Sequence, residues 1–203
     1  MTDEMNALEL DALQEVFNVG VGRAAASLSM LTNEPVSMSV PVIHILSPQR
    51  AAEFLDPRHD QNLTSVSQHF NGSFSGRALL IFPSINSLEV VRLMLGSDAP
   101  AEQLSEIEQD AMSEVGNIIL NACFAIIAEM LNERFKCQLP TFSTGYISDI
   151  LKPSMSEKQV LILQIRLGLE NHKIEGFLAF LLGNESQTSL HKAIKLFLSN
   201  VEA

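Results

Sequence analysis

Two stretches of this 203-residue chain, DALQEVFN at residues 11–18 and DAMSEVGN at residues 110–117, repeat Asp, Glu and Asn in one register. Each stretch lies in a run whose apolar residues recur at three- and four-residue steps. Such periodicity predicts two long amphipathic helices, over residues 5–32 and 105–134. The fold must therefore accommodate two similar long helices, one from each half of the chain.

The start of the second helix is predicted from a capping box. Ser105 is followed three residues later by Glu108, the pattern in which the two side chains cap each other's backbone N–H groups. Residues 86–95 and 188–198 are predicted as shorter helices, and residues 47–60, which have no equal counterpart in the second half, as a surface loop with a short helix. Strands are predicted over residues 36–47, 71–82, 141–150, 160–169 and 174–182.

The two halves match beyond the helices. SGRALLIF at residues 75–82 aligns with EGFLAFLL at residues 175–182, which places Gly76 on Gly176. We interpret this as an internal duplication with half-repeats of about residues 1–100 and 101–203. Because each half is small, the two are expected to share one sheet and one core. The predicted fold is a single α+β domain over residues 1–203, pseudo-two-fold symmetric, with an antiparallel or mixed sheet packed against two long helices.

The composition excludes several functions. A net charge of −11 disfavours a nucleic-acid binder and a basic helix on a membrane surface. No secretory signal pattern is present, and the most apolar stretch, residues 118–128, is too short for a membrane span. Cys123 is predicted to be a buried apolar residue, and the two cysteines form no disulfide framework or metal-binding spacing. We expect a cytoplasmic protein that binds neither nucleic acid nor membrane.

The repeated polar residues are spaced i, i+4 and i+7, which places them within an arc of roughly 60° on one helix face. That face lies away from the apolar stripe, so these side chains are predicted to point outward. They are Asp11, Glu15 and Asn18 in the first helix and Asp110, Glu114 and Asn117 in the second.

An outward polar face on a single helix is most often only solvated. Here, however, core positions diverged between the halves while the outward residues did not: Phe17 corresponds to Gly116, and Gly20 to Ile119. Retention of surface residues beside divergent core residues favours a function for the polar face.

The pattern extends to a proline. The twenty-third residue after each Asn is Pro, at Pro41 and Pro140. The full spacing, D/S-x3-E-x2-N-x22-P, resembles the signature of the CheC, CheX and FliY group of chemotaxis phosphatases, over essentially the whole chain. Two intact copies are similar to the two-site CheC type, since CheX-type members carry one such site. FliY-type members carry a further flagellar-switch domain, which these 203 residues are not expected to contain.

The resemblance implies that the chain removes the phosphoryl group from the aspartyl phosphate of a CheY-type response regulator. One residue of each motif would orient the attacking water, one would pair with the receiver's active-site lysine, and one would support them. By motif position these are Asn18 and Asn117 for the water, Glu15 and Glu114 for the lysine, and Asp11 and Asp110 in support. No cofactor or metal of its own is expected, because the Mg²⁺ would belong to the receiver.

The implied roles agree with the chemistry of the residues. Phosphoryl transfer needs positioning and charge stabilisation more than covalent help. A neutral amide can accept a hydrogen bond from water and donate one to a phosphoryl oxygen, whereas a carboxylate would repel the anion. Two internal sites also make a monomer the expected state.

The alternative functions are a non-catalytic adaptor and a small-molecule phosphatase. A non-catalytic adaptor could keep the helix faces for docking alone, either on a response regulator or on a CheD-type deamidase, a partner that the resemblance also implies. A small-molecule phosphatase lacks support, because the sequence has no nucleophile motif and His59-Asp60 has no further metal ligands at a telling spacing. Gly20, Gly22 and Gly116, which flank the motifs, are predicted to allow close packing of the long helices or to leave room for a phosphoryl group.

Overall fold

The computed structural model describes residues 5–95, 101–132, 134–151, 159–169 and 172–201. The helices are α1 (Ala7–Thr32), α2 (Pro48–Leu55), α3 (Ser84–Leu95), α4 (Ala101–Leu131), α5 (Ile147–Leu151) and α6 (Asn184–Val201). The strands are β1 (Val36–Leu46), β2 (Leu63–Asn71), β3 (Ser75–Pro83), β4 (Lys136–Cys137), β5 (Thr141–Gly145), β6 (Gln159–Leu169) and β7 (His172–Leu182).

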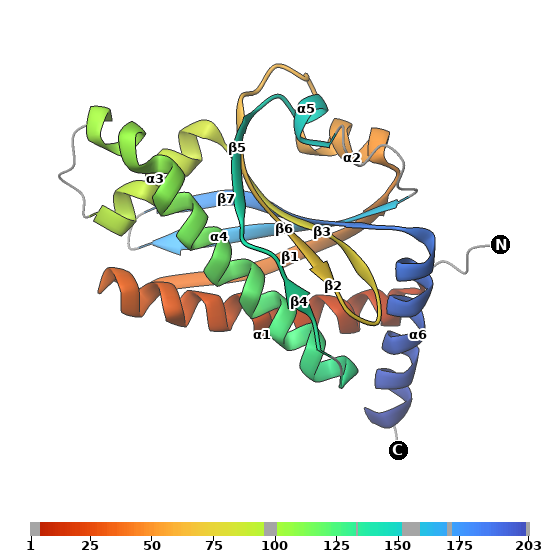
Figure 1. Cartoon of the computed structure of the whole chain (residues 1–203). Coiled ribbons are helices and arrows are strands. Elements are labelled where there is room, and N and C mark those ends of the chain that lie inside the picture. Colours follow the sequence, from red (N-terminus) through yellow and green to blue (C-terminus); the bar gives the residue numbers. More distant parts are fainter. Residues whose placement is uncertain (1–4, 96–100, 133, 152–158, 170–171, 202–203) are drawn as a thin grey trace.

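The strands form one antiparallel sheet in the order β1-β6-β7-β3-β2, with β4 and β5 both pairing with β2 at the far edge (Figure 1). Exchanging the two halves, so that β1 replaces β4–β5, β2 replaces β6 and β3 replaces β7, leaves this order unchanged. At its centre Leu79 pairs with Ala179, two residues that the sequence alignment also equates. The sheet thus has the symmetry that a duplication would produce, and the duplication itself stays our interpretation.

Helices cover both faces of the sheet (Figure 1). On one face α1 and α4, with α3 and α6 beside them, bury a cluster that includes Phe17, Met112 and Phe180. On the other face the shorter α2 and α5 bury a second cluster, around Leu55 and Ile147. The alternation of strand side chains between these two clusters explains why β3 and β7 read as continuous apolar runs.

The start of α1 is tied to the last helix of the chain. Asn6 caps α1 in a reciprocal box with Glu9, whose carboxylate also meets the His191 ring of α6 at 2.9 Å. Glu9 is only 3% exposed. Burial raises the pKa of this carboxyl, but its hydrogen bonds to the Asn6 backbone and His191 outweigh that effect, so its pKa lies below the ordinary value.

The matching position on α4 is Glu108, which contacts α3, the last helix of the first half. Its carboxylate accepts hydrogen bonds from the hydroxyls of Ser87 on α3, at 2.5 Å, and Thr64 on β2, at 3.1 Å. The predicted capping box at Ser105 is therefore wrong: α4 already begins at Ala101, and Glu108 serves a tertiary contact instead. Since each long helix is fastened to the last helix of the other half, the two halves form one folding unit.

The strand predictions were wrong in several places, and the short β4 (Lys136–Cys137) was not predicted. Strand β2, Leu63–Asn71, was missed, because its buried Thr64 and Gln68 break the apolar alternation expected of a strand. The strand predicted over residues 71–82 is β3, which begins at Ser75. The strand predicted over residues 141–150 ends at Gly145 and continues as α5, which packs against α2 as a short counterpart in the second half.

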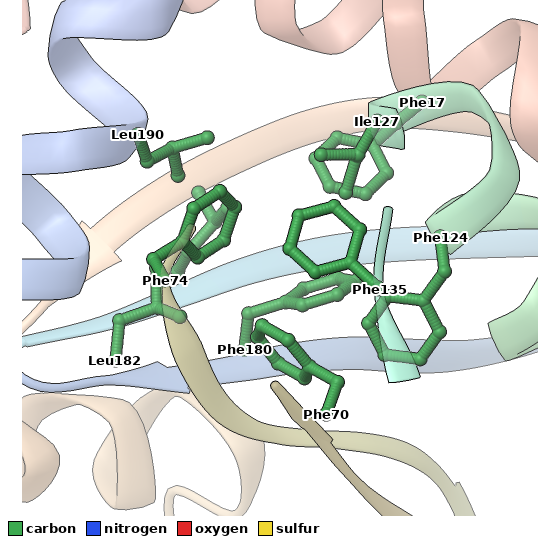
Figure 2. Close-up of a pocket in the computed structure, with 10 residues that line it drawn as sticks. Phe17, Phe70, Phe74, Phe124, Ile127, Phe135, Phe180, Leu182 and Leu190 are labelled. Atoms are coloured by element: carbon green, nitrogen blue, oxygen red, sulfur yellow. The ribbon is translucent and has the colours of Figure 1, made fainter. Parts of the chain in front are cut away.

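Phenylalanines from α1, α4, β2 and β7 meet beneath the long helices (Figure 2). The ring of Phe70 lies 4.9 Å from that of Phe124 and 5.8 Å from that of Phe135, centre to centre. A void of about 10 Å³ remains between them, and its lining is wholly apolar. A space that small and apolar stays dry, so it is a packing defect and not a ligand site.

Within the described residues, one segment, Ile107–Met130 of α4, is long and apolar enough to cross a membrane. Half of its most apolar window is buried inside the protein. Met112 and Ile119 of this segment are fully buried in the core cluster beneath the long helices, so it packs as a core helix, although it is longer than the stretch of residues 118–128 that the sequence suggested.

Candidate functional site

The two repeated motifs form two surface patches, which we call the first face (Asp11, Glu15 and Asn18 on α1) and the second face (Asp110, Glu114 and Asn117 on α4). The four carboxylates are exposed and the two asparagines are half-buried. The helical spacing predicted this outward placement. The half-burial of the asparagines was not predicted, and it comes from hydrogen bonds that each makes within the protein.

Asn18 is held by the backbone of β1. Its Oδ1 accepts a hydrogen bond from the Val40 N–H at 2.8 Å. Strand β1 has a register shift between Ser39 and Val42, so one extra residue bulges there. A backbone N–H can only donate, which fixes the Asn18 amide with Oδ1 toward β1 and Nδ2 away from it.

This contact accounts for the spacing between Asn18 and Pro41. Proline has no N–H and is tolerated within a sheet at a bulge. Pro41 lies in the bulge, directly after the residue whose N–H reaches Asn18. In the second half, Pro140 lies at the corresponding break between β4 and β5, where the pairing with β2 also shifts by one residue. Both prolines therefore lie within an interruption of an edge strand, where they leave no ladder hydrogen bond unmade.

Asn117 is held by side chains. Its Oδ1 accepts from Asn121 Nδ2 at 2.8 Å, one helical turn further along α4. Asn121 Oδ1 in turn accepts from Nε2 of Gln68 on β2, at 3.4 Å, and the same Nε2 donates to the Gln138 carbonyl at 2.8 Å. The second face is thus supported by a chain of amides that runs down to a residue only 3% exposed, Gln68.

The three glycines beside the faces have three different surroundings. A Cβ at Gly20 would lie 3.3 Å from the Cα of Cys123, so this glycine lets α1 approach α4, as predicted. A Cβ at Gly116 would lie 2.4 Å from a methyl of Val66, so here the helix approaches the sheet instead. A Cβ at Gly22 would meet nothing within 4 Å, and this glycine leaves open surface one turn beyond Asn18.

An exposed apolar side chain lies near each face. Leu8, 56% exposed, precedes Asp11 by one helical turn, and Leu139, 89% exposed, adjoins the Gln138 carbonyl that supports the second face. Isolated exposed leucines are ordinary. Beside these acidic faces they add apolar area that a docked partner would cover.

The remaining residues with reactive or metal-binding side chains form no further site within the described part of the chain. Cys123 is fully buried as predicted, and burial raises the pKa of its thiol to about 12. His59 and Asp60 lie exposed after α2, and across the described residues no three His, Cys, Asp or Glu side chains come together as a metal site would require.

The residues that sequence reasoning missed are Val40, Asn121 and Gln68. Val40 contributes only its backbone N–H, so the type of residue at this position gives no signal in the sequence. Asn121 had a signal, because it continues the outward stripe at i+4 from Asn117 and interrupts an apolar run. Gln68 could be identified only once strand β2 was known, because it reaches Asn121 from that strand.

No family model matches the chain. CheC of Bacillus subtilis (strain 168), a CheY-P phosphatase, is 24% identical over 152 residues, which cover 73% of this chain and 72% of that protein.

Among solved structures, Thermotoga maritima FliY superposes with a TM-score of 0.79 at 17% identity, over 96% of this chain and 100% of that one. A chain of a CheX–CheY–BeF3–Mg²⁺ complex from Borrelia burgdorferi superposes with a TM-score of 0.51 at 19% identity, over 82% of this chain and 95% of that one. These two likenesses show the fold. The chain is thus similar in sequence to a CheC protein and in fold to FliY, and with its two intact motifs it resembles the CheC/CheX/FliY-type chemotaxis phosphatases.

Proposed function

We propose that this protein hydrolyses the aspartyl phosphate of a CheY-type response regulator at two sites, the first and second faces. The observation that carries the proposal is the fixed amide in each face. Each motif Asn has its Oδ1 held by one N–H of the protein, and no described residue accepts a hydrogen bond from its Nδ2. The sequence similarity to a CheY-P phosphatase supports the same function.

A fixed amide suits the reaction. The carbonyl oxygen has two lone pairs, so Asn18 Oδ1 can accept a second hydrogen bond, from water, while it stays bound to Val40. Its Nδ2 then donates to a phosphoryl oxygen. Because the amide is held before the substrate arrives, it positions the water without losing rotational freedom at that moment. Asn117 would do the same at the second face.

The hydrolysis itself is balanced without a covalent intermediate on this chain. The water oxygen bonds to phosphorus, the bond from phosphorus to the aspartyl oxygen breaks, and the receiver regains its carboxylate. The protons of the water leave with the inorganic phosphate and solvent. Such a step depends on positioning and electrostatics, which are the contributions that an amide and a neighbouring carboxylate can make.

The carboxylates would provide the docking charge. Glu15 and Glu114, both exposed, would each pair with the active-site lysine of a receiver, with Asp11 and Asp110 in support. Mg²⁺ would come with the receiver, so the chain would need no metal or cofactor of its own. The Borrelia burgdorferi complex, which contains CheX, CheY, BeF3 and Mg²⁺, supports a receiver as the partner.

The wider setting follows from this function. We expect the protein to work in the cytoplasm, as a monomer whose two faces each take one receiver, with a CheD-type deamidase as a further partner. An adaptor that binds receivers without hydrolysis would use the same faces, and only a rate measurement separates the two functions.

The test is the decay of acyl phosphate on a CheY-type receiver with this protein at substoichiometric concentration. Wild type is expected to accelerate the decay, Asn18→Ala and Asn117→Ala each to lower the acceleration, and the double variant to abolish it. Each substitution removes the group that orients water but leaves the exposed carboxylates for docking.

Asn86→Ala is the matched control. It removes an amide that donates to the Glu175 carbonyl at 3.0 Å, on α3 and outside both faces, so its rate should equal that of wild type. Receivers that bind the protein yet lose phosphate at the spontaneous rate would overturn the enzyme in favour of the adaptor.

A further inference from the structure

The two faces present the same three residues but hold their asparagines in different ways. At the first face the donor to Asn18 Oδ1 is a backbone N–H in a strand bulge. At the second face the donor to Asn117 Oδ1 is the side chain of Asn121. The corresponding position on α1 is Gly22, which offers no side chain at all.

The difference continues one layer deeper. Gln68, which meets Asn121, pairs across the sheet with Ala78, and Leu163 pairs with Leu178 in the other half. Since residues 78 and 178 correspond, Leu163 is the counterpart of Gln68. The two positions that carry amides in the second half, Asn121 and Gln68, therefore carry a glycine and a leucine in the first half. Both amides are present at the second site, and neither has a polar counterpart at the first.

The direction of the amide chain is set at its buried end. The Gln138 carbonyl can only accept, so Gln68 must turn Nε2 toward it. The same Nε2 lies 3.4 Å from Asn121 Oδ1, which leaves Asn121 Nδ2 to donate to Asn117 Oδ1. Each amide fixes the next, and the last one presents Asn117 Nδ2 outward, the same orientation that Val40 gives Asn18.

We propose that Asn121, oriented by Gln68, is the positioning residue of the second site and replaces there the backbone N–H that anchors the first. The proposal rests on the proposed function for its kinetic consequence. Its structural consequence, that Asn117 is held still by Asn121, does not depend on any activity.

The kinetic test uses the Asn18→Ala background, in which only the second site acts. Asn121→Ala there is expected to lower kcat by at least about tenfold with KM unchanged, because a mispositioned water affects the reaction step and not the docking. Asn121→Asp keeps the shape but removes the donor, so Asn117 would turn its Nδ2 inward; the loss should be at least as large. Asn121→Ala in the Asn117→Ala background should leave the first site unchanged.

Two further variants separate positioning from folding. Gln68→Leu copies the residue of the other half, and is expected to lower kcat at the second site alone. Because Gln68 is buried, its variant could lose stability, and urea unfolding would reveal that loss. Asn121 is exposed, so its variants carry the conclusion, and Asn86→Ala in the same background controls for the loss of one amide hydrogen bond.

The structural test is the ¹⁵N relaxation of the side-chain amides by NMR. Asn121→Ala should make the Asn117 amide more mobile and leave that of Asn18 unchanged. An Asn117 amide as rigid as in wild type would overturn the proposal whatever the activity, and an increase in second-site kcat would do so by showing that Asn121 competes with water. A second site that is inactive even with Asn121 intact, but whose Asn117 amide loosens in Asn121→Ala, would count against the proposed function and not against the anchor.

Discussion

The first and second faces hold the same side chain, a motif Asn, in two different ways. Both hold an Asn amide at the surface with its nitrogen outward, one from a strand bulge and one from a chain of side-chain amides. Their glycines differ as well: Gly20 lets helix meet helix, whereas Gly116 lets helix meet sheet. The surface residues are thus alike while the supporting structure differs, which is the pattern we expect if the two halves arose by duplication and the outward residues were constrained more than their supports.

The largest expected effect comes from replacing either motif Asn by Asp. The carboxylate can still accept from Val40 at the first face, or from Asn121 at the second, so the free energy of unfolding should change little. It cannot donate to a phosphoryl oxygen and repels that anion, so the rate of the altered site should fall by about a hundredfold. Acyl-phosphate decay with one site intact in each variant measures this, and unequal losses at the two sites would show that the amides act differently.

The next effect concerns stability. In Gly116→Ala the new methyl would overlap Val66, which is fully buried and branched at Cβ, so we expect a loss of about 2 kcal/mol from overpacking. Gly20→Ala meets the α4 backbone at 3.3 Å and gains helix propensity, so its net change should be smaller. Urea unfolding of both variants tests the difference.

A second substitution identifies the cause of the Gly116→Ala loss. Val66→Ala opens space where the new methyl would lie, so the double variant should be more stable than the sum of the two single effects predicts. Strictly additive losses would mean that Val66 is not the obstacle.

The sequence predicted those parts of the fold that follow from the spacing of apolar residues. Both long helices, the shared sheet and the outward direction of Glu15 and Glu114 follow from apolar spacing and were found in the structure. Strand β2 could not be predicted, because Thr64 and Gln68 are buried polar residues whose partners, Glu108 and Asn121, lie far along the chain.

In the candidate site, only the residues on the surface could be predicted from the sequence. The motif residues could be named, and their roles stay a prediction. Their supports could not, because one is a backbone N–H and the other depends on contacts across two helices and a strand. The capping box predicted at Ser105 was wrong for a related reason. Glu108 accepts hydrogen bonds from the hydroxyls of Thr64 and Ser87, which lie in the first half of the chain.

A smaller effect is expected where the two long helices begin. Glu9 and Glu108 occupy matching positions, but Glu9 meets His191 while Glu108 meets hydroxyls. Glu9→Gln loses a charged partner of a buried ring and should cost about 1.5 kcal/mol at neutral pH. Glu108→Gln should cost less, because an amide oxygen also accepts from Ser87 and Thr64.

The cost of Glu9→Gln should depend on pH. The pKa of Glu9 in the folded protein lies below its ordinary value, so its ionised form stabilises the fold fully above that ordinary value, about 4.3. This contribution is lost as the pH falls through the lowered pKa. Wild type and variant should therefore converge in acid, and a difference that persists there unchanged would mean that packing and not charge ties α1 to α6.

The smallest effect separates Gly22 from its counterpart Asn121. A methyl at position 22 meets nothing within 4 Å, so Gly22→Ala should stabilise α1 by up to about 1 kcal/mol through helix propensity alone. At the matching position on α4, Asn121→Ala gains the same kind of propensity but gives up two hydrogen bonds, with Asn117 and Gln68. Its free energy of unfolding should therefore rise less than that of Gly22→Ala, or fall. Equal gains for both variants in urea unfolding would mean that the amide chain contributes nothing to stability, and that its value to the protein lies wholly in where it holds Asn117.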